Sequence, residues 1–258
     1  MIRLPVCPYF ASLNHPVSGD LPMFHNHYVP LAAALIPGLI ACAISPASEP
    51  RTDPTSTLLG MPLLFSDDFE ENSESKWTPT DAKAWKIIQQ NGNSVYNQFA
   101  QSDYTPPVRN PHNRNLIKNI VVGDFVLELL VKSTGKNNAH RDLCFFFGFQ
   151  NPANLYYVHL GKQADLHANS IFFVNNKPRV SIAQERTDGT PWDDEWHRVR
   201  IVRRVESGEI LIYFDDMNKP AMKTIHKRFT WGQVGIGSFD DTGYFDEVRL
   251  WGNRVASP

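Results

Sequence analysis

A polar trio stands at the entrance to an aromatic run in the stretch AHRDLCFFFGFQ, residues 139–150. His140, Arg141 and Asp142 supply an imidazole, a guanidinium and a carboxylate, groups that transfer protons or hydrogen-bond hydroxyl groups. Two more histidines follow, His159 in NLYYVHLG and His167 in ADLHANS. If the segments that carry them are neighbouring strands, these side chains converge. His140, Asp142, His159 and His167 are therefore candidate catalytic residues.

The same cluster has two other interpretations. A His–Asp or Arg–Asp pair can close the end of a buried strand, because polar groups that enter a core need partners. Asp142, His159 and His167 would also suit a metal site of two histidines and one carboxylate. We expect Asp142, Cys144 and Gly148 to share one face of the strand, with Gly148 leaving room for a ligand or for a neighbouring bulky residue. Mutual burial would favour a structural role, and an open pocket would favour chemistry.

Further residues have side chains of the kind that bind sugars, since guanidinium and amide groups donate to hydroxyls and aromatic rings stack on C–H faces. The segment SDYTPPVRNPHNR is too Pro-rich for a central strand and indicates a long loop, either functional or covering a sheet edge. The turn-rich segment ERTDGTPWDDEWH predicts an exposed Trp192 beside acidic residues. The candidate substrate-binding residues are Tyr104, Arg109, Arg141, Tyr157, Asn169, Arg186 and Trp192.

Short strand-like segments make up the chain from residue 61 onward. GDFVLELLVK (123–132) alternates apolar and mixed positions, and LCFFFGFQ (143–150) is apolar on both faces. Turn signals such as Asn151-Pro152 and Ser207-Gly208 separate the segments. No segment has the period of an amphipathic helix. This pattern predicts an all-β fold, a two-sheet antiparallel jelly-roll β-sandwich, formed by a single domain over residues 61–258.

The N-terminal part has the character of a targeting segment. Residues 28–44, YVPLAAALIPGLIACAI, form an apolar run shorter than the about 20 residues of a spanning helix. Ala41-Cys42-Ala43 suits signal cleavage, and Leu39 to Cys42 has the form of a bacterial lipobox; Met23 is an alternative start. We expect residues 1–44 to direct export, residues 45–60 to be a flexible linker, and a lipid on Cys42 to be the one link to a membrane.

Charge and cysteine content exclude several function classes. The chain of 258 residues has a formal net charge of -2, so no extended basic field favours nucleic acid. Of three cysteines, Cys7, Cys42 and Cys144, only the last lies past residue 60. A disulfide framework within the sandwich is therefore impossible. We expect Cys144, inside an apolar strand, to be a passive buried thiol.

The ordered series LLFSDDFE, VGDFVLELLVKS, FFFGFQNPANLYYVHL, WHRVRIVR, GEILIYFDD and GQVGIGSFDDTGYFDEVRL resembles a known superfamily. It is similar to the laminin-G-like members of the concanavalin A-like lectin/glucanase superfamily, and within it to bacterial 3-keto-disaccharide hydrolase (DUF1080-like) sandwiches. The resemblance covers about residues 63–252. It implies a jelly roll whose first and last strands pair and whose concave sheet often holds sugar. It also implies a structural calcium near Asp67, Asp68 and Asp246, for which hard oxygen ligands are suited.

The function that follows is carbohydrate binding or processing by an exported protein, with a glycan or disaccharide as partner. The glucanase signature ExDxxE is absent, so that mechanism is not expected. One alternative is a glycoside hydrolase or 3-keto-disaccharide hydrolase-like enzyme that uses His and Asp as acid and base. A second alternative is a laminin-G-like protein-interaction domain. The superfamily holds all of these activities, so the fold does not choose among them.

Overall fold

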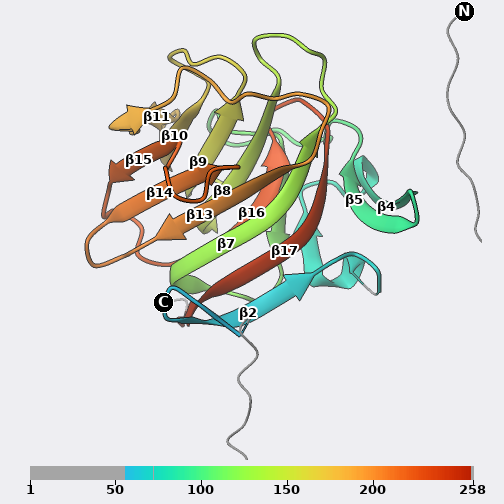
Figure 1. The fold of residues 1–258 in the computed structure, drawn as a ribbon. Coiled ribbons are helices and arrows are strands. Elements are labelled where there is room, and N and C mark those ends of the chain that lie inside the picture. The colour runs from blue at the N-terminus through green and yellow to red at the C-terminus, as the bar shows by residue number, and fades with distance from the viewer. Residues whose placement is uncertain (1–55, 72, 257–258) are drawn as a thin grey trace, which may run out of the picture. The chain divides into compact units, whose positions relative to one another are not determined.

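Two antiparallel β-sheets form the sandwich in the computed structural model, which describes residues 56–256 except residue 72 (Figure 1). The larger, ten-stranded sheet has the order β1-β2-β17-β7-β13-β14-β15-β12, with β5 also paired to β17 and β4 to β5. Its strands are β1 (Thr57–Leu58), β2 (Met61–Asp67), β4 (Trp85–Gln90), β5 (Asn93–Gln98), β7 (Val122–Ser133), β12 (Glu185–Arg186), β13 (His197–Arg203), β14 (Glu209–Phe214), β15 (Met222–Ile225) and β17 (Gly243–Arg254).

The second sheet has seven strands in the order β11-β10-β9-β8-β16-β6-β3. In the described residues, helical structure is limited to two short 3₁₀ turns, η1 (Glu74–Lys76) and η2 (Ala82–Ala84). No helix there is long and apolar enough to cross a membrane. The strands of the second sheet are β3 (Trp77–Pro79), β6 (Asn113–Ile117), β8 (Asp142–Asn151), β9 (Asn154–Gly161), β10 (Ser170–Asn175), β11 (Val180–Ser181) and β16 (Gln233–Ser238).

The predicted jelly-roll β-sandwich is confirmed, and so are the main strand segments. Ser207-Gly208 joins β13 to β14 as an antiparallel hairpin, with Gly208 at a φ of +82°. The first long strand, β2, pairs with the last, β17. The linker expected over residues 45–60 is described only from Ser56 onward, where Thr57–Leu58 already pairs with β2. The targeting segment, its Cys42 and Met23 lie outside the described residues.

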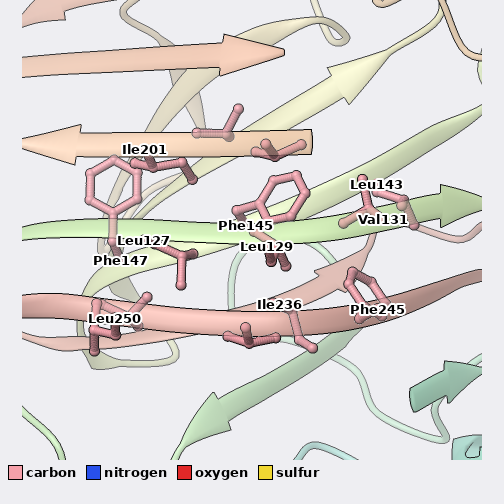
Figure 2. Packing of buried hydrophobic residues seen from close by; sticks show 14 of the residues in the cluster. Leu127, Leu129, Val131, Leu143, Phe145, Phe147, Ile201, Ile236, Phe245 and Leu250 are labelled. Atoms are coloured by element: carbon pink, nitrogen blue, oxygen red, sulfur yellow. The ribbon is translucent and has the colours of Figure 1, made fainter. Parts of the chain in front are cut away.

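Strand alternation builds the core between the sheets. Leu127, Leu129 and Val131 of β7 point toward β8, which contributes Leu143, Phe145 and Phe147 (Figure 2). Each of these side chains is almost completely buried. Burial of one Leu or Phe stabilises a fold by about 1.5–3 kcal/mol, so this layer fixes the register of β7 and β8.

A second apolar cluster lies on the opposite, outer face of the seven-stranded sheet. The alternate residues of β8 and β9 form it, among them Cys144, Phe146 and Tyr157, as the alternation predicted. Val108 from the Pro-rich loop and Phe239 pack against it. That loop therefore covers an outer sheet face. Cys144 is fully buried, and burial raises the pKa of its thiol well above the usual value, which agrees with a passive core thiol.

Glycines determine how closely the strands approach this face. At Gly237 of β16 a Cβ would lie 1.9 Å from the Asn113 carbonyl oxygen, so only glycine fits. Gly148 behaves differently from the prediction. It sits where the β8 register shifts, has a φ of +54°, and a Cβ there would meet Tyr156 and Phe229 of the core. The irregularity turns Gly148 toward the core, so it does not share the outer face with Cys144, and its small size leaves room for the bulky Tyr156 rather than for a ligand.

Candidate functional site

An open pocket lies where β8 begins and β9 ends, beside the outer apolar cluster. Its volume is about 210 Å³, below the roughly 300–1,000 Å³ of typical ligand sites, and so suits a small ligand or one unit of a larger one. Five separate segments meet there, because β16 lies next to β8 and Arg179 of the β10–β11 turn contacts Tyr157 of β9. The lining residues are Arg109, His140, Asp142, His159, Asp165, His167, Ala168, Arg179, Phe239 and Asp240.

Asp142 and His159 form a buried pair at the base of this pocket. Cys144 is opposite His159 in the β8–β9 register, which places Asp142 one step away on the same face. The His159 Nε2 contacts the Asp142 Oδ2, and both side chains are more than nine-tenths buried. On the other side of the ring, the Asn169 backbone N–H donates to the His159 Nδ1 at 3.2 Å. The two imidazole nitrogens therefore both have partners.

These partners determine the tautomer of His159. A nitrogen that accepts from a backbone N–H carries no proton, so the Nδ1 is unprotonated and the proton lies on the Nε2, which faces the Asp142 Oδ2 in an ion-pair contact without hydrogen-bond geometry. Protonation of the Nδ1 would break the bond from Asn169. The pair is thus suited to hold the pocket in shape, and His159 is poorly placed to serve as a general acid.

The same argument bears on a metal. The ligand atoms of Asp142, Cys144 and His159 lie within 4.8 Å of one another and are all buried. A metal on the His159 Nε2 would require a proton on the Nδ1, which instead faces the Asn169 N–H. The Cys144 thiol also has a raised pKa, which disfavours the thiolate that binds metals. The donor set at this location does not fit a metal ion.

Asp142 also fixes the segment that follows β16. Its Oδ1 accepts from the Phe239 N–H at 3.3 Å, and its own N–H donates to the Asp241 Oδ2 at 2.8 Å. Burial raises the pKa of Asp241 to about 6, and the charge of Asp142 adds to the shift. Asp142 therefore connects β8, β9 and the 239–241 turn, and positions the pocket's aromatic ring.

Two arginines lie over that ring. The guanidinium carbon of Arg179 is 4.5 Å from the Phe239 centroid and 4.9 Å from that of Phe172, and Arg109 is 5.7 Å from Phe239. The Arg179 Nη1 donates to the Tyr157 Oη at 3.0 Å and its Nη2 to the His167 carbonyl at 3.0 Å. Its Nε is buried and has no partner. Arg179 is thus held in one orientation with a donor unused.

A loop between β9 and β10 supplies the acidic and imidazole rim. The Asp165 Oδ1 accepts from the His167 N–H at 2.5 Å, and this hydrogen bond lowers the pKa of Asp165. The Arg186 Nη1 donates to the carbonyls of Asp165, Ala168 and Asn169 at 2.9–3.1 Å. The His167 imidazole is exposed and makes no side-chain hydrogen bond to Asp142 or His159 in the described structure. The expected convergence is therefore partial, since Asp142 and His159 pair while His167 stands at the rim.

The pocket contains five of the candidate residues: His140, Asp142, His159, His167 and Arg109. Three more support it from behind. Tyr157 lies under Arg179. Asn169 binds the His159 Nδ1 through its backbone, while its side chain bonds to the Thr187 carbonyl and the Thr190 hydroxyl. Arg186 holds the rim loop.

Three candidates lie elsewhere. Arg141 points to the opposite side of the strand from Asp142, where it donates to the Ser133 carbonyl at 2.6 Å and forms an ion pair with Asp194. Tyr104, within the Pro-rich loop, packs against Arg114 and does not line the pocket. The expected exposure of Trp192 is wrong. It is 2% exposed, and its Nε1 donates to the Leu160 carbonyl, so the turn-rich loop folds its ring into the core.

The two acids proposed as calcium ligands are already engaged. Both Asp246 oxygens accept hydrogen bonds, from the Asn93 amide and the Glu247 N–H, and burial raises the pKa of Asp246. The exposed Asp68 accepts from the Glu70 N–H at 3.4 Å. Neighbouring Asp67 is occupied by Lys76, Ser73 and Trp77. Calcium at these positions stays a prediction, and the hydrogen bonds give it no support.

Sequence reasoning missed Arg179, Phe239 and Asp240. Arg179 follows the turn signal Asn175-Asn176, and Phe239 and Asp240 stand at the end of GQVGIGSF. Each lies just beyond a strand, a location from which side chains often reach a site. That positional signal was present, but the partner strand of β16 could not be inferred from chain order.

No protein-family model matches this chain, and no curated protein matches it in sequence. Solved structures of similar arrangement exist. A carbohydrate-binding module from Bacillus subtilis is 18% identical, with 69% of this chain and 96% of that chain covered and a TM-score of 0.49. Winged bean acidic lectin complexed with methyl-α-D-galactose is 14% identical, and the match covers 74% of this chain and 98% of that chain with a TM-score of 0.47. A Bacillus subtilis protein with a galectin-like fold is 10% identical, and the match covers 75% of this chain and 97% of that chain with a TM-score of 0.47. Likeness at these levels supports no argument about function.

Proposed function

We propose that this chain binds carbohydrate in the pocket between the starts of β8 and β11. The observation that carries the proposal is the set of polar groups in the pocket that lack protein partners. Arg109, His140, His167 and Asp240 each present a side chain without a hydrogen bond or ion pair within the described residues. Sugars are recognised by such mixed donors and acceptors, which match hydroxyl groups that both give and take hydrogen bonds.

The rigidity of the pocket supports the same function. Asp142 fixes the Phe239 backbone, Arg186 fixes the rim loop, and Tyr157 fixes Arg179. A site whose walls are already ordered loses little conformational entropy when a ligand binds. This organisation favours a binding module, since the buried His159–Asp142 pair holds the site in shape.

A glycan array with the full chain tests this function. We expect a defined subset of glycans to bind, and binding to fall at least tenfold when Asp240→Asn is combined with His167→Gln, since each lost hydrogen bond is worth about 0.5–1.5 kcal/mol. Both residues are exposed, so the variant should fold. A matched control is Asp216→Asn, an exposed acid away from the pocket. Absence of binding to any glycan would overturn the proposal.

A hydrolase related to the 3-keto-disaccharide hydrolase-like sandwiches is the second candidate. It is favoured by one observation, the free imidazoles of His140 and His167 in a pocket that also holds the Asp165 and Asp240 carboxylates. These groups could exchange protons with a bound sugar. Release of reducing sugar by the full chain, abolished by His167→Gln and His140→Gln together, would establish hydrolysis. Glycan binding without release of reducing sugar would support a binding module and contradict hydrolysis. Export and lipidation of Cys42 remain predictions that belong to the same proposal.

A further inference from the structure

Two arginines in the pocket lack a carboxylate partner. Arg109 makes no hydrogen bond or ion pair within residues 56–256, residue 72 apart, and its guanidinium lies over the Phe239 ring. Arg179 makes hydrogen bonds only to a hydroxyl and a carbonyl, and its buried Nε–H is unused. By contrast, Arg141, Arg198 and Arg200 elsewhere in the sandwich are paired with Asp194 or Glu128.

The two charges are close together. The guanidinium carbons of Arg179 and Arg109 lie 4.5 and 5.7 Å from the centroid of the same ring, so they are about 10 Å apart at most. This separation does not exceed the distance of about 10 Å over which 0.1 M salt screens charge. The ring offsets part of their repulsion through cation–π attraction. It does not neutralise either charge, and an anion bound in the pocket that both arginines line would.

The nearby carboxylates do not fill this role. Asp142 is engaged by His159 and the Phe239 N–H. Asp165 is occupied by the His167 N–H, and Asp240 forms no ion pair with either arginine. Asp165 and Asp240 remain available to accept hydroxyl hydrogen bonds. The pocket thus presents two arginines without an ion-pair partner beside the Asp142, Asp165 and Asp240 carboxylates, of which the last two can accept from hydroxyls.

The geometry points to an acidic saccharide as the ligand, with its anionic group held by Arg109 and Arg179 and its hydroxyls by the neighbouring acids and imidazoles. This inference rests on the proposed function and names its ligand class. Guanidiniums bind carboxylate and sulfate groups through paired N–H donors, and such charge-assisted bonds are about twice as strong as neutral ones. The anionic group is a uronate carboxylate or a sulfate ester, two sources of one chemistry.

Calorimetric titration of the full chain with three matched oligosaccharide sets tests the inference. The sets are oligogalacturonates, sulfated galactan oligosaccharides and neutral galacto-oligosaccharides. We expect at least one acidic set to bind roughly tenfold or more tightly than the neutral set at 50 mM salt, and this preference to shrink at 500 mM salt. The acidic set that binds identifies the anionic group.

Variants locate the site. Arg109→Gln removes an exposed, unbonded charge and should fold as the parent does; with Arg179→Gln, it should remove most of the preference for acidic over neutral ligands. Arg249→Gln, an arginine remote from the pocket, should leave that preference unchanged. Equal binding of neutral and acidic sets, or an acid preference that survives both pocket variants, overturns the inference while the carbohydrate function stands. Failure of all three sets to bind overturns both.

Discussion

The substitution Asp142→Asn should destabilise the protein strongly although it changes the side chain by one atom. The carboxylate faces two buried N–H groups: its Oδ1 accepts from the Phe239 N–H, and its Oδ2 contacts the His159 Nε2. An amide offers one oxygen and one NH₂ group, so one of these donors must then face another donor. His159 cannot relieve the conflict by changing tautomer, because its Nδ1 already accepts from Asn169. One unsatisfied buried group costs about 1–3 kcal/mol, so we expect the free energy of unfolding to fall by about 1–3 kcal/mol.

Urea unfolding of the full chain measures this loss of stability. If the dependence of the unfolding free energy on urea concentration is the same for parent and variant, a change in midpoint reports a change in stability. The matched control is Asp241→Asn, which keeps an oxygen for the Asp142 N–H and should not destabilise the protein at pH 8. Nitrogen-15 shifts of the His159 ring provide an independent test, with the proton expected on the Nε2. An Asp142→Asn variant within about 0.5 kcal/mol of the parent, the scatter of neutral surface substitutions, would refute this description of the pair, as would a proton on the Nδ1.

Three further predictions follow from the contacts. The pKa of Asp241 is about 6 against the ordinary 3.8, so its charged form destabilises the fold and the free energy of unfolding should rise as pH falls from 7 toward 4. Asp241→Asn should therefore stabilise the protein by about 1 kcal/mol at pH 8, after allowance for solvent screening, and by less near pH 4. Thermal melts of parent and variant compared across pH measure both effects. Arg186→Gln should speed amide exchange around Leu166, which is 81% exposed, with Arg249→Gln as the control. Trp192→Ala should cost about 3–5 kcal/mol in urea unfolding, and the half-buried Trp196→Ala much less. Equal effects at the two tryptophans would contradict the core assignment of Trp192.

Local alternation predicted the strands and much of their orientation. The apolar period of two placed Leu127 and Leu129 in the core, and the turn at Asn151-Pro152 made β8 and β9 neighbours, which brings Asp142 close to His159. Such features depend on residues within about 20 positions of one another, so the sequence contains them directly.

The positions that the sequence did not predict depend on contacts between segments that are far apart in the chain. Phe239 reaches the pocket because β16 pairs with β8, with Gly237 opposite Cys144, although these segments are far apart in the chain. Trp192 is buried because its loop folds back until the indole N–H meets the Leu160 carbonyl. Neither event leaves a local pattern in the sequence, since each depends on which strands become neighbours in the sheet.

The central claim is that the pocket beside Asp142 and Phe239 binds a saccharide. The most direct measurement is a backbone amide NMR titration of the full chain with the glycan that binds best on the array. We expect the largest shift changes at Phe239, Asp240 and His167, with saturation at one ligand per chain. Saturable shifts confined to another region, such as the groove beside Phe214, or no saturable shifts with any glycan, would contradict the claim.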